Sequence, residues 1–262
     1  MTDSIINIAM NAALSAGKII IRSLDRLDTI KVIEKKPNDY VTEIDQAVER
    51  EIIKVIRKAY PKHGILAEES GESPGEEYQW IIDPIDGTRN FIHGFPHFAI
   101  SIGVRYRNKI EYGVIYDPIR DELFSAVRGK GARLNDRKIR VSGCKSLKNS
   151  LIGTGFAHRH KTEYPEAFNQ IAANLLPACG DIRRAGAATL DLAYVACGRL
   201  DGFWEMGLQI WDMAAGSLLV KEAGGLVTDP QGGDDYFTSG NIVVGTPNIL
   251  KLMLKEMKPF VG

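Results

Sequence analysis

Apolar residues recur along the chain with two different spacings. In residues 5–21 and 42–59 they return every three or four positions, which predicts two long amphipathic helices. Residues 30–32 alternate apolar with polar, which is typical of a strand. The apolar runs at 65–67 and 80–82 are short, and each is followed at once by an acidic residue. We interpret both runs as buried strands that carry carboxylates at their C-terminal ends.

The middle of the chain predicts antiparallel strands. Residues 98–104 and 109–116 are apolar runs on either side of Arg107-Asn108, as expected for a hairpin, and residues 122–127 fit a third strand. Residues 71–77 are rich in Gly, Pro and Glu, so we expect a mobile surface loop there.

The second half of the chain alternates strands with helices. Residues 129–146 hold many Gly, Lys and Arg residues and show little periodicity. We therefore place a boundary in this segment and expect two subdomains, at residues 1–140 and 141–262. The predicted strands are 151–154, 202–205 and 242–244, and the predicted helices are 167–176, 187–197, 213–223 and 248–257.

Composition and charge narrow the function classes. The 262 residues are 44% hydrophobic, and 33 basic residues balance 33 acidic ones. A neutral chain has no overall basic field that would attract nucleic acid or anionic membranes. The three cysteines form no C-x-x-C pair, which disfavours a zinc site or a disulfide framework and fits a reduced, cytoplasmic protein. We find no run of about 18 apolar residues and no signal peptide, so we expect no membrane partner.

The strongest chemical signal is Asp83-Pro84-Ile85-Asp86-Gly87-Thr88. Asp83 ends an apolar strand, where an unpartnered carboxylate is costly and a divalent cation is a natural companion. Pro84 favours an extended backbone before it, and Thr88 opens a short helix whose N–H groups can hold a phosphate. One Asp-Pro or Asp-Gly dipeptide would indicate only a turn. Two acids three positions apart, between an apolar strand and a helix start, indicate a metal site instead.

Three further segments place acids beside apolar elements. Asp212 precedes an apolar helix, where it can act as an N-cap, as a metal ligand, or as both. Glu68 directly follows a predicted strand and is a better ligand candidate than Glu69, which fits a solvated loop. Asp45 lies three positions after Thr42, which fits either a helix capping pair or a site carboxylate that orients a hydroxyl or a water.

Together the four segments resemble the inositol monophosphatase family in order and spacing, over nearly the whole chain. The segments are Asp39-Tyr40-Val41-Thr42-Glu43-Ile44-Asp45, Glu68-Glu69-Ser70, Trp80-Ile81-Ile82-Asp83-Pro84-Ile85-Asp86-Gly87-Thr88-Arg89-Asn90-Phe91 and Trp211-Asp212-Met213-Ala214-Ala215-Gly216. Similarity to the bacterial SuhB-type branch of this family extends to Tyr116-Asp117-Pro118, Leu190-Asp191-Leu192-Ala193-Tyr194-Val195 and Glu222-Ala223-Gly224-Gly225.

The resemblance implies an αβαβα layered sandwich, the sugar-phosphatase fold, and a lithium-sensitive phosphoric monoester hydrolase. Such an enzyme would hydrolyse inositol monophosphate with two to three Mg²⁺ ions, using a water activated at the metal site. The N-terminal subdomain would carry most of the metal ligands. The implied metal ligands are Glu68, Asp83, the Ile85 carbonyl, Asp86 and Asp212, and the implied catalytic residues are Asp45, Thr88 and Glu68. The implied substrate contacts are Asp86, Gly87, Thr88, Gly186, Ala187, Ala188, Glu205 and Asp212.

Three departures from the family pattern leave the substrate open. Arg89 stands where many members have Thr, Ala187 where Ser or Thr is usual, and Gln209 where the family has His or Arg. Histidinol phosphate, fructose 1,6-bisphosphate and a nucleotide 3′-phosphate are therefore alternatives, although Asn90-Phe91 favours the inositol branch. The resemblance also implies a homodimer and an association with antitermination factors and RNA polymerase. Arg183-Arg184 is a candidate contact for that association, and a solvated pair is the simpler explanation.

Overall fold

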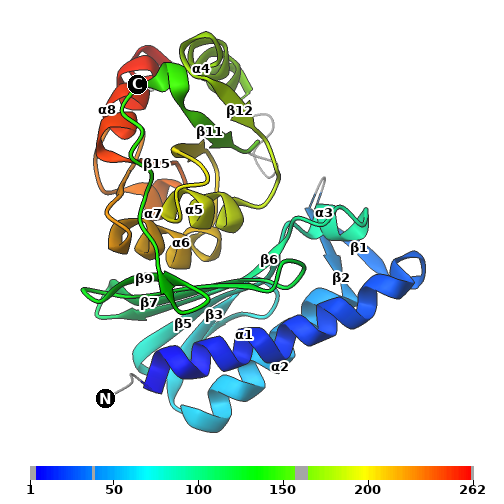
Figure 1. Ribbon diagram of the computed structural model, residues 1–262. Coiled ribbons are helices and arrows are strands. Elements are labelled where there is room, and N and C mark those ends of the chain that lie inside the picture. Colours follow the sequence, from blue (N-terminus) through cyan, green and yellow to red (C-terminus); the bar gives the residue numbers. More distant parts are fainter. Residues whose placement is uncertain (1–3, 37–38, 157–164, 261–262) are drawn as a thin grey trace.

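Helices and sheets alternate in five layers (Figure 1). The computed structural model describes residues 4–36, 39–156 and 165–260. The outer layers are α1 (Ser4–Ser23) with α2 (Glu43–Ala59), and α4 (Pro165–Ala178) with α8 (Pro247–Met257). Between the two sheets lie α5 (Ala188–Ala196) and α6 (Ile210–Glu222). The expected αβαβα sandwich is confirmed.

The larger sheet has eight strands in the order β10-β9-β8-β7-β6-β5-β3-β4, and only the β3–β5 pair is parallel. Its strands are β3 (His63–Ala67), β4 (Gly71–Ser73), β5 (Glu76–Asp86), β6 (Ala99–Tyr106), β7 (Lys109–Asp117), β8 (Glu122–Val127), β9 (Gly131–Leu134) and β10 (Arg137–Lys138). A separate ribbon pairs β1 (Val32–Lys36) with β2 (Asp39–Thr42). The short helix α3 (Thr88–Ile92) follows β5.

The expectation of a surface loop at residues 71–77 was wrong in part, because the segment contains β4 and the first residues of β5. The segment 129–146, in which we placed a subdomain boundary, contains β9 and β10. All three residues of β4 are exposed, as are both residues of β10. These edge strands are held by backbone pairing and bury little side-chain surface, so they leave no apolar pattern in the sequence.

The smaller sheet has five strands in the order β12-β11-β13-β15-β14. They are β11 (Leu151–Thr154), β12 (Asp181–Arg183), β13 (Gly202–Glu205), β14 (Leu226–Thr228) and β15 (Ile242–Gly245). The short elements α7 (Tyr236–Ser239), η2 (Leu147–Asn149) and η4 (Lys258–Phe260) complete this half. The sequence analysis did not predict β12, β14 or α7. Strands β12 and β14 have only three residues and are partly exposed, whereas the predicted four-residue strands β13 and β15 are buried throughout.

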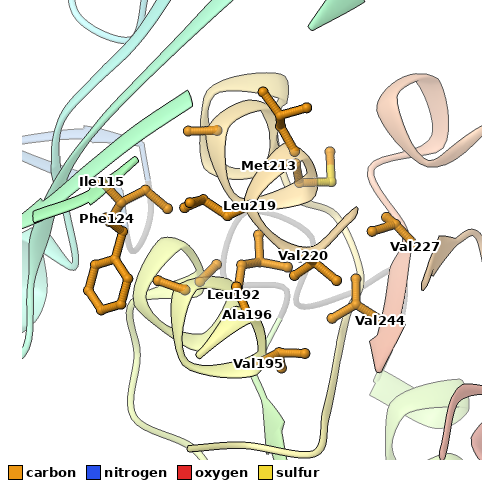
Figure 2. Packing of buried hydrophobic residues seen from close by; sticks show 14 of the residues in the cluster. Ile115, Phe124, Leu192, Val195, Ala196, Met213, Leu219, Val220, Val227 and Val244 are labelled. Atoms are coloured by element: carbon orange, nitrogen blue, oxygen red, sulfur yellow. The ribbon is translucent and has the colours of Figure 1, made fainter. Parts of the chain in front are cut away.

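Both faces of the larger sheet are buried. Trp80 and Ile82 of β5 join the core under α1 and α2, whereas Ile81 between them joins the core under α5 and α6. Figure 2 shows this second core, with Phe124 of β8 on one side of α5 and α6 and Val244 of the smaller sheet on the other. Side chains alternate along a strand, so each buried strand contributes to two layers of packing.

Helix α1 with the 3-10 turn η1 (Leu24–Thr29) is long and apolar enough to cross a membrane by length and composition alone. In that respect the expectation that no such segment exists was wrong. The helix lies against α2 and β7, and Ala9, Ala12 and Ile20 on it are fully buried. Its apolar face therefore belongs to the core between the first two layers.

Candidate active site

Three carboxylates from two distant segments meet between the sheets. Asp83 and Asp86 come from the end of β5, and Asp212 comes from the first turn of α6. Each offers an oxygen, and the three oxygens lie within 4.8 Å of one another. Asp83 and Asp212 are buried, and Asp86 is partly exposed. We call these residues the acidic group.

An irregularity in β5 brings its two acids together. Asp83 pairs with Ser101 of β6 and Asp86 pairs with Ala99, so three steps along β5 match two along β6. In a regular strand, residues three apart point to opposite faces, and an extra residue in one strand cancels that alternation. Pro84 lies inside the irregular stretch, where its missing N–H removes no ladder bond. The Asp-Pro-Ile-Asp spacing thus places both carboxylates in one group.

Asp212 lies in the first turn of α6, but it is not the N-cap of that helix. Helix α6 begins at Ile210 and not at Met213 as expected, so Asp212 is the third residue of the helix. The backbone N–H of Gln209 donates to Asp212 Oδ2 at 2.7 Å. Gln209 therefore occupies the N-cap, and Asp212 satisfies its N–H while lying in the acidic group.

Glu68 and the acidic group line one pocket. Among the described residues, however, Glu68 is not one of the acids whose oxygens lie within 4.8 Å of one another. The turn after it is held by Glu49, a buried residue of α2. Glu49 accepts hydrogen bonds from the backbone N–H groups of Glu69 and Ser70, both at 2.9 Å. The sequence analysis missed Glu49, although an acid among the apolar positions of α2 was a usable signal.

Asp45 and Thr88, which the family resemblance implies as catalytic residues, are in contact. Thr88 Oγ1 lies 3.1 Å from Asp45 Oδ1 and 2.9 Å from the Ile85 carbonyl oxygen. The single hydroxyl proton can go to only one of these acceptors at a time. Asp45 Oδ2 also accepts from the N–H of Thr42 at 2.8 Å and from the Thr42 hydroxyl, which completes a capping box on α2. The capping role and the site role of Asp45 therefore coexist.

The acidic group lies in a pocket between the two halves of the chain. It is lined by Tyr40, Glu68, Asp83, Ile85, Asp86, Gly87, Thr88, Arg89, Asn90, Phe156, Arg184, Gly186, Ala188, Glu205, Gly207, Leu208 and Asp212. Of the predicted site residues, only Asp45 and Ala187 do not line it. Asp45 is buried against Thr88, and Ala187 is 1% exposed.

The bend at Gly87, on the pocket wall, requires glycine. Gly87 has a φ of +89°, and an added Cβ would lie 3.0 Å from the His97 carbonyl oxygen.

Asn90 links the two halves beside the pocket, and the sequence analysis gave it no such role. Its Nδ2 donates to the carbonyl oxygens of His97 at 2.7 Å and Ala185 at 2.9 Å. The segment that carries Gly186 is thereby held against the segment after β5. No local pattern could reveal a contact between residues this far apart in the sequence.

The electrostatics of the pocket favour a bound cation. Burial raises the pKa of Glu205 well above its ordinary value, and the nearby charges of Asp191, Asp212 and Asp86 raise it further against the opposing effect of Arg184. Burial also raises the pKa of Asp45, while hydrogen bonds from Thr42 and Thr88 lower it. Several carboxylates that repel one another in a partly buried site need positive charge, and their hard oxygen donors fit Mg²⁺. The residues present therefore fit a divalent cation.

Comparisons with known proteins agree with this geometry. The sequence profile of the inositol monophosphatase family matches residues 1–259. The chain belongs to this family. A relative from Pseudomonas aeruginosa, named Nus factor SuhB, is 52% identical over 259 residues, which cover 97% of this chain and 96% of the relative.

Solved structures of the family share the whole fold. The crystal structure of the extragenic suppressor protein suhB from Bartonella henselae has a TM-score of 0.96 and 44% identity, and covers 99% of this chain and 100% of its own. An inositol monophosphatase from Anabaena has a TM-score of 0.86 and 37% identity, with coverages of 98% and 96%. The chain is thus a phosphatase of a family that is generally metal-dependent.

The structure places the three departures from the family pattern in different surroundings. Arg89 lines the pocket and lies 5.1 Å from the centre of the Tyr40 ring. Gln209 is the N-cap of α6, and Ala187 precedes α5 as its N-cap. The two neighbouring arginines at 183 and 184 also make different contacts. Arg183 forms an ion pair with Asp181, whereas Arg184 lies over the Phe156 ring and lines the pocket. Of the residues compared in this paragraph, Arg89 and Arg184 line the pocket.

Proposed function

We propose that this phosphatase hydrolyses inositol monophosphate or a closely similar polyol phosphate with Mg²⁺. The observation that carries the proposal is the convergence of Asp83, Asp86 and Asp212, with oxygens within 4.8 Å of one another in a pocket. Glu68 and the Ile85 carbonyl are proposed as the remaining ligands. Two to three ions bound there would neutralise the carboxylates and supply the Lewis-acid charge for attack of water on phosphorus.

The residues around the acidic group would orient the reactants. Thr88 Oγ1 donates its proton to Asp45 Oδ1 or to the Ile85 carbonyl oxygen, and a ligand role for that carbonyl leaves Asp45 as the acceptor. The lone pairs of the Thr88 oxygen then accept a hydrogen bond from the attacking water and aim it. Backbone N–H groups of Gly87 and Thr88 hold the phosphate, and Glu205, Gly186 and Ala188 face the polyol hydroxyl groups.

Phosphate release across a panel of substrates tests this proposal. The panel contains inositol 1-phosphate, histidinol phosphate, fructose 1,6-bisphosphate and a nucleotide 3′-phosphate, each with and without Mg²⁺. We expect inositol 1-phosphate to be the best substrate, metal to be required, and lithium to inhibit. Asp83→Asn should lose at least about 1000-fold in kcat/KM, since it removes a shared metal ligand. Asp136→Asn changes an exposed turn residue and is the matched control. Full activity of Asp83→Asn would remove that residue from the site.

A second function is favoured by the name of the most similar relatives reported above. The Pseudomonas aeruginosa relative is called a Nus factor, and it is 52% identical to this chain. We propose a partner role in transcription antitermination, alongside RNA polymerase, that does not require catalysis. Tagged Asp83→Asn protein should capture the transcription machinery as well as the unaltered chain does. No capture by either protein would end this second proposal and leave the phosphatase proposal intact.

We also propose that the chain is cytoplasmic and forms a homodimer, as the resemblance to the family implies. Light scattering should give twice the 28.9 kDa mass of one chain. A mass of one chain at micromolar concentration would refute the dimer.

A further inference from the structure

A hydroxyl group in the first turn of α5 contacts the acidic group from the opposite half of the chain. Thr189 donates to Asp86 Oδ2 twice, from its backbone N–H at 2.7 Å and from its Oγ1 at 2.6 Å. Thr189 is 0% exposed, so water does not compete for either bond. The contact joins the end of β5 to the start of α5, on which Ala188 also lines the pocket.

Two donors on one oxygen restrict what the carboxylate can do. A carboxylate oxygen has two in-plane lone-pair positions, and the two bonds from Thr189 use both positions of Oδ2. Rotation of the carboxylate would break both bonds, so the group is held in one orientation. The Asp86 carboxylate is thus held in the orientation in which it joins Asp83 and Asp212 in the acidic group.

We propose that Thr189 is a positioning residue that orients Asp86 for metal binding; this rests on the proposed use of Mg²⁺ at the acidic group. The backbone N–H alone would act as a single pivot, and the hydroxyl supplies the second contact that fixes the rotation. Ala187, two positions earlier, has no hydroxyl, so Thr189 is the residue at the start of α5 that provides one.

The neighbourhood of Asp86 explains why fixed donors are needed. Asp191 lies half a turn further along α5 and is buried, and the charge of Asp86 is among the causes that raise its pKa. Glu205 is affected by Asp86 in the same way. Further carboxyl groups therefore lie near Asp86, and the two Thr189 donors stabilise the charged form of the Asp86 carboxylate among them.

Isothermal titration of the metal-free protein with Mg²⁺ tests the proposal without measuring catalysis. Thr189→Val keeps the side-chain shape and the N–H bond but removes the hydroxyl. We expect about tenfold weaker binding at the site that uses Asp86, as is typical when a residue that orients a metal ligand is lost. Thr189→Ser restores the hydroxyl and should bind within twofold of the unaltered chain. Thr154→Val is the matched control, because its buried hydroxyl has no hydrogen-bond partner among the described residues.

A double-mutant cycle separates orientation of Asp86 from a general effect on packing. In an Asp86→Asn background, Thr189→Val should cost less than a further twofold in Mg²⁺ binding, because the group that it orients is already altered. Equal binding by Thr189→Val and the unaltered chain would overturn the proposal. Equal losses in Thr189→Val and Thr189→Ser, or full additivity in the cycle, would also overturn it, since these results assign the effect to shape.

The experiments distinguish failure of the proposed role of Thr189 from failure of the proposed phosphatase reaction. Mg²⁺ binding that depends on the Thr189 hydroxyl, without release of phosphate from any substrate, would refute the proposed reaction and leave the role of Thr189 standing. Phosphate release by the unaltered chain, together with unchanged Mg²⁺ binding in Thr189→Val, would refute the role of Thr189 and leave the proposed reaction standing. Failure of the unaltered chain to bind Mg²⁺ would overturn both.

Discussion

The two sides of the pocket are built in different ways. On the side of the larger sheet, the supports come from the same half of the chain: Asp45 is held by Thr42, three positions away, and the turn after Glu68 by Glu49, 20 and 21 positions from the groups that it binds. On the opposite side, the supports come from far along the chain. Thr189 holds Asp86 across 103 positions, and Asn90 holds the Ala185 carbonyl across 95.

This difference separates local chemistry from tertiary packing. The first side needs α2 and the C-terminal ends of β3 and β5, which all lie within the first 86 residues of the chain. The second side needs the smaller sheet, α5 and α6 to be seated correctly on the larger sheet before any ligand meets another. Substitutions between the layers should therefore disturb the site more than substitutions within the first side.

The largest effect is expected where α6 meets the larger sheet. A Cβ at Gly113 would lie 2.8 Å from the Ala215 carbonyl oxygen, and one at Gly103 would lie 2.8 Å from the Ala214 Cβ. Gly113→Val should push α6 away from the sheet and move Asp212 with it. We expect at least about 3 kcal/mol less stability in urea unfolding, together with loss of phosphatase activity.

Gly143→Ala is the control for this substitution, because nothing lies within 4 Å of its added Cβ. A Gly113→Val protein as stable and active as the control would show that close packing of α6 on the larger sheet does not position Asp212.

A slightly smaller effect is expected at His97, which lies between the two sides and packs edge-on against Tyr194 of α5 at 5.9 Å. Burial lowers the pKa of His97 to about 4, and the nearby charge of Arg120 contributes in the same direction while Asp117 opposes it. The folded protein thus resists protonation of this imidazole, whereas the unfolded chain takes up the proton near pH 6.5. Stability should be full above that pH and fall by about 3 kcal/mol as the pH drops from about 6.5 to 4.

Urea unfolding across this pH range measures the loss. His97→Gln should remove this part of the pH dependence, so that its curve diverges from that of the unaltered chain. Parallel curves for the two proteins would contradict the assignment to His97.

The same distinction explains how much the sequence could predict. Apolar periodicity located α2, β5 and β13 because each has a long or continuous buried pattern. Spacing paired Asp83 with Asp86, and the resemblance to the family added Asp212. Exposed β4 and three-residue β12 bury too little surface to leave a pattern.

The supports at Thr189 and Asn90 could not be predicted either. A buried Thr at a helix start is commonplace, and its partner Asp86 is fixed only when the two halves pack. The sequence therefore predicted the acidic group more fully than the residues that hold it in place.

A moderate effect should follow from weakening the first side at Glu49. Glu49→Gln leaves a single carbonyl acceptor where two carboxylate oxygens now bind the Glu69 and Ser70 N–H groups. We expect about 1–2 kcal/mol less stability, the usual value for a hydrogen bond with a charged acceptor. The Mg²⁺ concentration for half-maximal activity should also rise, because the turn carries Glu68. Glu43→Gln, on an exposed position of the same helix, is the control; an equal response of both variants would refute the role of Glu49.

The smallest effect is expected at a contact between the two sides that is open to solvent. Arg199, after α5, forms an ion pair with Glu122 of β8, and its side chain is 40% exposed. Although this pair joins the same two layers as Gly113 and α6, water and salt screen its charges, so it should contribute less than about 1 kcal/mol. Glu122→Gln should therefore unfold within that margin of the unaltered chain, and the difference should shrink further in high salt. A salt-independent loss comparable to that of Gly113→Val would mean that charge, and not close packing, sets the separation of the layers and with it the position of Asp212.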